Sequence, residues 1–156
     1  MKKLLSLLVA VILVTSIFAG CKQTAQPVTL VFAKSDAVEL DPADVTDGES
    51  VTVIDNIFEG LVRYKPGTTE VEPWLATSWD VSSDGLEWTF HLRQGVKFQD
   101  GTPFNADAVV FSYERQRDKE HPFHKYGKWE YWQWCFSEVS KTEKVDDYTV
   151  KMTLSH

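Results

Sequence analysis

Cysteine is scarce in this sequence, which limits the ways in which the fold is stabilised. The 156 residues contain only two cysteines, Cys21 and Cys135. Secreted domains often depend on disulfides, but if Cys21 carries another modification, Cys135 has no partner within the chain. Aromatic residues make up 13% of the sequence. Their large apolar side chains favour a fold that is stabilised by its core instead.

Positive charge is also in short supply. The chain has 16 Lys and Arg residues against 23 Asp and Glu residues, a formal net charge of −7. Without Lys2 and Lys3, which lie in an N-terminal targeting segment, the charge becomes −7 − 2 = −9. There is no cluster of Lys and Arg, so the composition excludes nucleic acid as a partner.

Motifs of catalysis are missing as well. The sequence contains no G-x-S-x-G, H-E-x-x-H, C-x-x-C or G-x-x-x-x-G-K-[ST] pattern. Its four histidines stand in no recognisable catalytic arrangement with a serine or a carboxylate. We therefore expect neither an enzyme nor a cofactor.

The N-terminus has the pattern of an export signal. Lys2 and Lys3 precede the apolar stretch 4–18, which is shorter than the ~20 residues of a membrane-spanning helix. The residues before Cys21 resemble a lipoprotein signal, which predicts a signal peptide at 1–20, diacylation of the Cys21 thiol and a polar tether at 21–27. An ordinary signal peptide that is cleaved near Ala19 is the alternative.

The most regular local pattern lies in residues 86–115. Apolar and polar residues alternate over 88–93, which predicts a half-buried strand. The Asp-Gly pair at 100–101 predicts a turn, and Asn105 predicts the N-cap of a helix. The apolar stripe of this helix is Val109, Val110 and Tyr113, whereas Glu114, Arg115 and Arg117 are expected on or near its solvated side.

Other segments predict a mixture of strands and helices. Residues 28–33 suggest a strand that is buried on both faces. Apolar spacing over 54–61 predicts a helix whose end Gly60 marks. One hairpin is expected from 76–81 and 87–92, and another with its turn at 146–147. The predicted fold class is therefore mixed α/β (α+β).

The sequence LEWTFHLRQGVKFQDGTPFNADAVVFSYER resembles the signature region of the family 5 extracellular solute-binding proteins, where FHLR-x-GVKF-x-DGTPF-x-A-x-x-VVFS recurs. Three further segments of this sequence, 40–42, 56–61 and 145–150, resemble segments of the same family and occur in the same order. The segment 115–127 resembles the dipeptide-binding branch. The resemblance covers about 28–154.

This resemblance implies a partial N-terminal lobe at 28–156, belonging to lobe I of a two-lobed, type II periplasmic-binding-protein-like fold, and hence a truncated chain. It implies a monomeric, exported lipoprotein at the cell membrane that faces the periplasm or the exterior. There it would bind di- or oligopeptides and deliver them to the permease of an ABC importer. The alternatives are a nickel, haem or other non-peptide solute binder of the same family, or a small structural surface lipoprotein.

The resemblance also indicates a ligand-binding segment, formed by Ser35, Asp36, Ala37 and Val38. This segment would lie along a peptide and form main-chain hydrogen bonds with it, as an added strand does. Its place beyond a strand agrees with the usual position of ligands in α/β sheets. Asp36 would attract a cationic group of the ligand. A solvated loop is the alternative interpretation.

Two groups of residues resemble metal ligands, but their spacing argues against that role. Asp41, Asp44 and Asp47 lack the spacing and the final glutamate of a calcium loop, so we expect them in turns and caps. His121 and His124 flank Pro122 and have no third ligand nearby. No metal site is therefore predicted.

The densest aromatic cluster comprises Trp129, Tyr131, Trp132, Trp134 and Phe136. Stacking on a ligand is one possible role, but burial in the core is the commoner use of such residues and is what we expect. Cys135 lies within this cluster, and we expect it to be a buried small hydrophobic residue.

Overall fold

The computed structural model describes residues 29–31 and 34–156, and the chain divides after Ala33 into two units. In the first unit, residues 29–31 have no regular secondary structure, and Leu30 and Val31 are exposed. For these residues the predicted buried strand is wrong. The remainder of that strand, the signal segment and Cys21 lie outside the described residues. The second unit, 34–156, contains all of the helices and strands that the structure describes.

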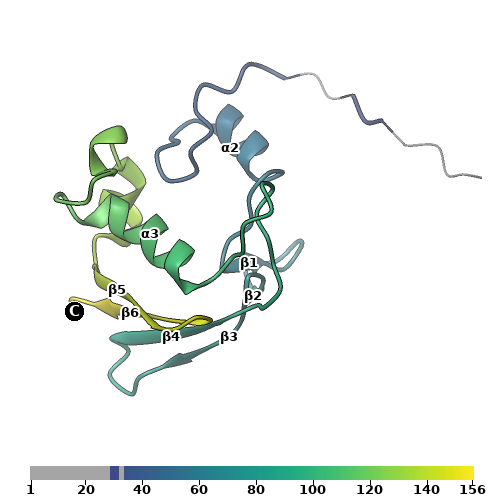
Figure 1. The fold of residues 1–156 in the computed structure, drawn as a ribbon. Coiled ribbons are helices and arrows are strands. Elements are labelled where there is room, and N and C mark those ends of the chain that lie inside the picture. The colour runs from purple at the N-terminus through teal and green to yellow at the C-terminus, as the bar shows by residue number, and fades with distance from the viewer. Residues whose placement is uncertain (1–28, 32–33) are drawn as a thin grey trace, which may run out of the picture. The chain divides into compact units, whose positions relative to one another are not determined.

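An antiparallel sheet of four strands forms the base of this unit, with the order β3-β4-β6-β5 (Figure 1). The strands are β3 (Ala76–Val81), β4 (Glu87–Leu92), β5 (Val139–Asp146) and β6 (Thr149–Leu154). Both predicted hairpins are confirmed, with turns at 82–86 and 147–148. The pairing of β4 with β6 joins the two hairpins, which lie far apart in the sequence.

Helix α3 (Ala106–Arg117) packs on one face of this sheet, above β5 and β6 (Figure 1). The helix begins as predicted, because the side chain of Asn105 accepts a hydrogen bond from the Ala108 amide at 3.2 Å. The core between helix and sheet consists of Leu92, Phe104, Ala106, Val109, Trp129, Trp132, Val139, Val150 and Met152.

The other face of the sheet is polar. Polar contacts connect neighbouring strands there: the ion pair Lys151–Glu87 at 3.1 Å and a hydrogen bond between His91 and Asp80 at 2.8 Å. One apolar and one solvated face are typical of an antiparallel sheet, and this division explains the alternation over 88–93.

A second, two-stranded sheet pairs β1 (Val62–Tyr64) with β2 (Val71–Pro73). It follows helix α2 (Gly48–Ile54), which begins at the N-cap Asp47. The predicted helix over 54–61 is therefore wrong. Helical turns continue only as far as the hydrogen bond from the Phe58 amide to the Ile54 carbonyl.

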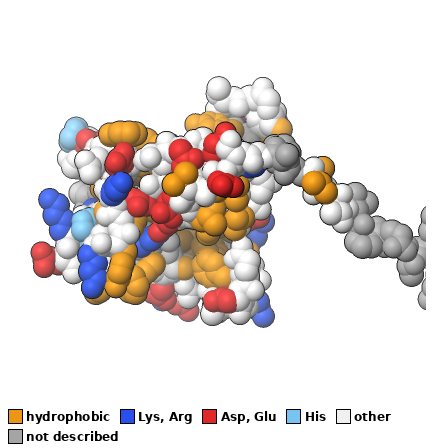
Figure 2. All heavy atoms as spheres, turned by 90° about the horizontal axis from the view of Figure 1, so that it is seen from above, with side chains coloured by type: hydrophobic (Ala, Val, Ile, Leu, Met, Phe, Trp, Pro, Cys, Tyr) orange, Lys and Arg blue, Asp and Glu red, His pale blue; other side chains and the backbone are white. Residues whose placement is uncertain are grey.

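The segment between α3 and β5 contains a 3-10 helix, η1 (His124–Tyr126), and a π-helix, η2 (Trp132–Phe136). Trp129 and Trp132 are buried, as expected, but Trp134 is 69% exposed and Phe136 39% exposed. The core prediction is thus correct for only part of the cluster. Cys135 is exposed, so its predicted burial is wrong. Figure 2 shows hydrophobic side chains close to acidic ones on one face of the molecule.

Candidate functional site

The predicted ligand-binding segment, 35–38, is a stretch without a strand partner among the described residues. Ser35 and Asp36 are exposed, and the side chain of Val38 is 84% exposed. At its end the main chain turns its amides toward the interior: those of Val38 and Glu39 both donate to the hydroxyl oxygen of Ser50, at 2.9 and 3.1 Å. The main chain is therefore fixed at 38–39 while the side chain of Val38 faces solvent.

Ser50 lies in the first turn of α2 and is completely buried. Asp47 holds it from the other side, because Asp47 Oδ1 accepts a hydrogen bond from the Ser50 amide at 2.8 Å. The Ser50 amide and hydroxyl both bond to the Asp47 carboxylate and hold its pKa below the ordinary value. Asp47 and Ser50 thus fix the first turn of α2, and Ser50 also fixes the main chain at 38–39.

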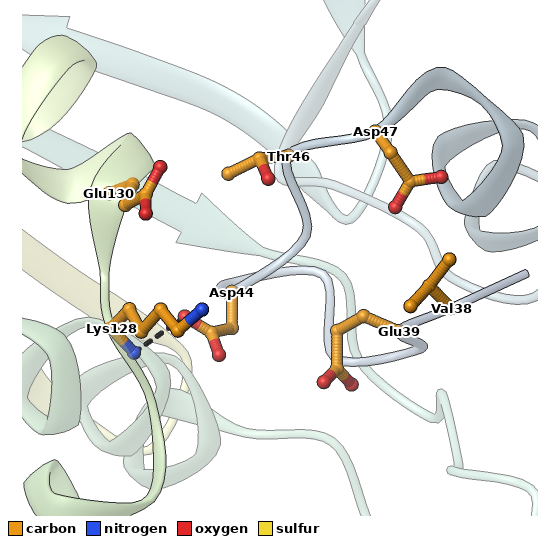
Figure 3. Close-up of a pocket in the computed structure, with 7 residues that line it drawn as sticks. All are labelled: Val38, Glu39, Asp44, Thr46, Asp47, Lys128 and Glu130. Carbon is orange, nitrogen blue, oxygen red and sulfur yellow. Dashed lines mark hydrogen bonds between the residues drawn. The ribbon is translucent and has the colours of Figure 1, made fainter.

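A hollow of about 200 Å³ opens beside Val38. Its lining comes from two parts of the chain, 38–47 and 128–130, which face each other across it (Figure 3). Drug-sized ligands occupy pockets of ~300–1,000 Å³, so this space suits one group of a ligand rather than a whole one. The lining residues are Val38, Glu39, Asp44, Thr46, Asp47, Lys128 and Glu130.

Four of these lining residues carry carboxylates and one carries an ammonium group. Several of the carboxylates have structural partners. Asp44 Oδ1 accepts hydrogen bonds from the amides of Lys128 and Trp129, at 2.6 and 3.0 Å, and Glu39 accepts from the two amides that follow it. Acidic groups therefore outnumber the basic one in this lining, and hydrogen bonds hold three of them, those of Glu39, Asp44 and Asp47.

An ion pair between Asp41 and Arg115 fixes the same segment to α3. Both guanidinium nitrogens Nη1 and Nη2 contact the Asp41 carboxylate at 2.6 Å. Burial alone would raise the pKa of Asp41. The hydrogen bonds from Arg115 and the Ala43 amide, together with the Arg115 charge, outweigh burial and leave the pKa below its ordinary value.

Glu114 and Arg115 depart from the sequence expectation, because their side chains are only 15% and 18% exposed. Glu114 Oε1 accepts a hydrogen bond from the Thr142 amide at 2.8 Å, and Glu114 Oε2 binds Arg117. The predicted solvated side of α3 is therefore wrong for these two residues. They connect the helix to β5 and to the segment at Asp41.

The two histidines of the metal hypothesis have other contacts. His124 Nδ1 lies 3.0 Å from the Arg115 carbonyl, and the His121 ring packs against Phe111. Within residues 29–31 and 34–156, no three His, Cys, Asp or Glu side chains are placed so that they could hold a metal ion together. No helix in the described part of the chain has the length and apolar character needed to span a bilayer.

The structure thus brings Val38, Asp44 and Asp47 together and leaves Asp36 exposed and outside the lining of the hollow. As predicted, the three aspartates lie in turns and caps: Asp41 accepts from the Ala43 amide and Asp47 caps α2. Sequence reasoning missed Ser50. Asp47 stands three residues before it, at the spacing of a helix N-cap, but this spacing does not show that the serine side chain is buried.

The family model for bacterial extracellular solute-binding proteins, family 5 Middle, matches residues 70–156. The chain belongs to this family of substrate-binding proteins.

Three relatives illustrate the similarity. Heme-binding protein A of Haemophilus influenzae is 43% identical and matches 81% of this chain and 25% of its own length. Dipeptide-binding protein of Escherichia coli is 40% identical, and the match covers 85% of this chain and 27% of that protein. The structure of the dipeptide binding protein of Pseudoalteromonas sp. SM9913 was solved in complex with Met-Leu. It matches this chain with a TM-score of 0.73 and 32% sequence identity, and the match covers 80% of this chain and 27% of that protein.

The chain therefore spans about a quarter of the length of these relatives. The solved relatives are two-lobed periplasmic binding proteins, and the likeness to them confirms the predicted fold class.

Proposed function

We propose that this chain is part of the substrate-binding component of an ABC importer, and that it captures di- or oligopeptides and delivers them to the permease. The observation that carries this proposal is the combined similarity, in sequence and in fold, to dipeptide-binding proteins, one of them bound to Met-Leu. The position of 35–38 at the surface, without a strand partner among the described residues, supports it, because a main-chain contact accepts peptides of many sequences.

Calorimetric titration of the protein that the native gene encodes, with a set of dipeptides, tests this proposal. Dissociation constants in the micromolar range or below are the expected result. If no dipeptide binds while the protein is folded, peptide capture is wrong. The 156-residue chain on its own is expected to bind weakly or not at all, because a two-lobed protein closes both lobes over its ligand.

Haem is a second candidate ligand, because the 43% identical relative is named a heme-binding protein. A Soret-band titration with haemin, carried out on the same preparation, separates the two. A stoichiometric shift of the absorption band that a dipeptide does not displace would favour haem.

We further propose that Cys21 anchors the exported protein in a membrane through lipid. Two acyl chains provide a stable anchor, since each buried methylene contributes about 0.8 kcal/mol. Cell fractionation of a Cys21→Ala variant tests this. The variant is expected in the soluble fraction, and a variant that stays with the membranes contradicts the anchor.

A further inference from the structure

The segment at 37–39 has an unusual hydrogen-bonding arrangement. Two consecutive amides, of Val38 and Glu39, converge on one acceptor, Ser50 Oγ. The described residues contain no cis peptide bond, and in a trans peptide the carbonyl points opposite to the amide of the same plane. The carbonyls of Ala37 and Val38 therefore both point away from Ser50.

Among the described residues, neither of these two carbonyls accepts a hydrogen bond. The segment is also at the surface, since the Val38 side chain is 84% exposed and Glu39 is exposed. Its donors thus point inward and two of its acceptors point outward. A peptide that paired with it as a regular strand would need alternating donors and acceptors, and at 38–39 the donors are already taken.

We propose that Ser50 is a positioning residue that makes this segment an acceptor site for hydrogen-bond donors of the ligand. This inference rests on the proposed peptide-binding function and specifies its chemistry. The ligand presents an amide N–H or its α-ammonium group to the carbonyls of Ala37 and Val38. Ser50 itself does not touch the ligand.

Two features support carbonyl acceptors at this segment and donors on the ligand. The hollow beside Val38 is lined by four carboxylates and one ammonium group, so the local potential favours a donor or a cation. Ser50 is also rigidly held: it is fully buried, and its own amide is bound by Asp47 at 2.8 Å. Because the Ser50 hydroxyl accepts from both amides, it orders the two peptide planes before the ligand arrives, and such preorganisation lowers the entropic cost of binding.

The experiment compares three ligands on the protein that the native gene encodes. The first is Ala-Ala, or the best-binding dipeptide. The second is its ester analogue, in which oxygen replaces the amide N–H, and the third is its desamino analogue, which lacks the ammonium group. The proteins are wild type, Ser50→Ala and Thr52→Ala. Thr52 lies in the same helix, and its hydroxyl bonds to the Gly48 carbonyl, so it is the matched control.

In wild type, at least one analogue is expected to bind about tenfold more weakly, the effect of one hydrogen bond to a well-placed acceptor. In Ser50→Ala the penalty for that same analogue falls to about threefold or less, while Thr52→Ala keeps the wild-type ratio. The analogue whose ratio changes identifies the donor. A variant that merely loosens the fold weakens all three ligands equally and leaves the ratios unchanged.

Unchanged ratios in a folded Ser50→Ala variant overturn the positioning role. If the variant does not fold, wild type still decides: equal affinity for all three ligands overturns the acceptor site. If wild type binds dipeptides, the proposed function stands and the ligand ratios test only the role of Ser50. If it binds none, the proposed function fails, and the inference fails with it.

Discussion

Asp41 and Arg115 lie 74 residues apart in the sequence, yet their side chains meet in a two-pronged ion pair with both N–O distances at 2.6 Å. The guanidinium also lies over the ring of Trp129, 5.0 Å from its centroid. This contact connects the chain just after 35–38 to α3 and to the buried aromatic residues. The candidate site is thus supported by the core of the unit.

Replacing Arg115 by lysine tests the value of this geometry. Lysine keeps the charge but cannot bind the carboxylate with two parallel hydrogen bonds. We expect the free energy of unfolding, measured with urea, to fall by about 1–2 kcal/mol. Arg63→Lys is the matched control, because Arg63 pairs with Glu72 and lies over Trp74, but at the surface. Its loss should stay below about 0.5 kcal/mol, and equal losses in both variants would contradict the special role of Arg115.

The lowered pKa of Asp41 predicts acid sensitivity. A carboxyl whose pKa in the folded state lies below the unfolded value of 3.8 stabilises the fold above that pH, and this contribution disappears as the pH falls through the folded pKa. The difference in unfolding free energy between wild type and Asp41→Asn should therefore be constant from about pH 5 to 8 and shrink below about pH 4.

Urea titrations of both proteins at several pH values measure this difference. Other aspartates with lowered pKa values also contribute to acid unfolding, among them Asp47 and Asp100. Subtracting the two curves isolates Asp41. A difference that grows toward low pH would show that the sign is wrong.

Asp44 stabilises a strained part of the backbone. Its carboxylate accepts from the amides of Lys128 and Trp129, and Trp129 has a φ of 54°, in the left-handed region. Asp44→Ala leaves two amides without their acceptor and should cost about 2–3 kcal/mol in thermal or urea unfolding. Asp44→Asn keeps an acceptor oxygen and should cost about 1 kcal/mol or less. If the two variants lose the same stability, the carboxylate does not hold this turn.

The strands and α3 could be predicted because their signals are local. Alternation over 88–93 reflects one buried sheet face, and Asn105 caps the helix that follows it. Helix α2 could not be predicted in this way. Val51, Thr52 and Val53 are β-branched and have low helix propensity, so its stability comes from the Asp47 cap and from tertiary contacts.

The errors at the site have a common cause. Glu114 and Arg115 look like solvated helix residues, but their partners, Thr142 and Asp41, lie 28 and 74 residues away. No local pattern reveals such pairs. Likewise, a short aromatic cluster does not show that a π-helix will bury Trp132 and expose Trp134.

The exposure of Cys135 predicts a thiol that reacts without unfolding. We expect Ellman's reagent to modify it in the native protein about as fast as in urea, because access rather than opening of the fold limits the reaction. Cys135→Ser is the control that removes this signal and leaves any contribution of Cys21. Protection of the thiol by more than about tenfold in the native state would mean that Cys135 is buried in solution.

Among the glycines of the described residues, Gly127 has the least room for a side chain, because the Trp129 ring lies against it. A Cβ atom on Gly127 would lie 2.6 Å from the Trp129 indole ring. The φ of Gly127 is −138°, which alanine adopts freely, so the cost of Gly127→Ala is steric. We expect a loss of about 1–3 kcal/mol. Gly48→Ala is the control, since its Cβ would meet nothing within 4 Å, and it should be neutral or slightly stabilising.

A double variant shows whether the ring causes this loss. Trp129→Phe alone removes buried surface and should also destabilise the protein. Combined with Gly127→Ala, the smaller ring leaves room for the new methyl group, so the double variant should lose less than the two single losses added together. Strict additivity in urea unfolding would mean that the indole does not pack on Gly127.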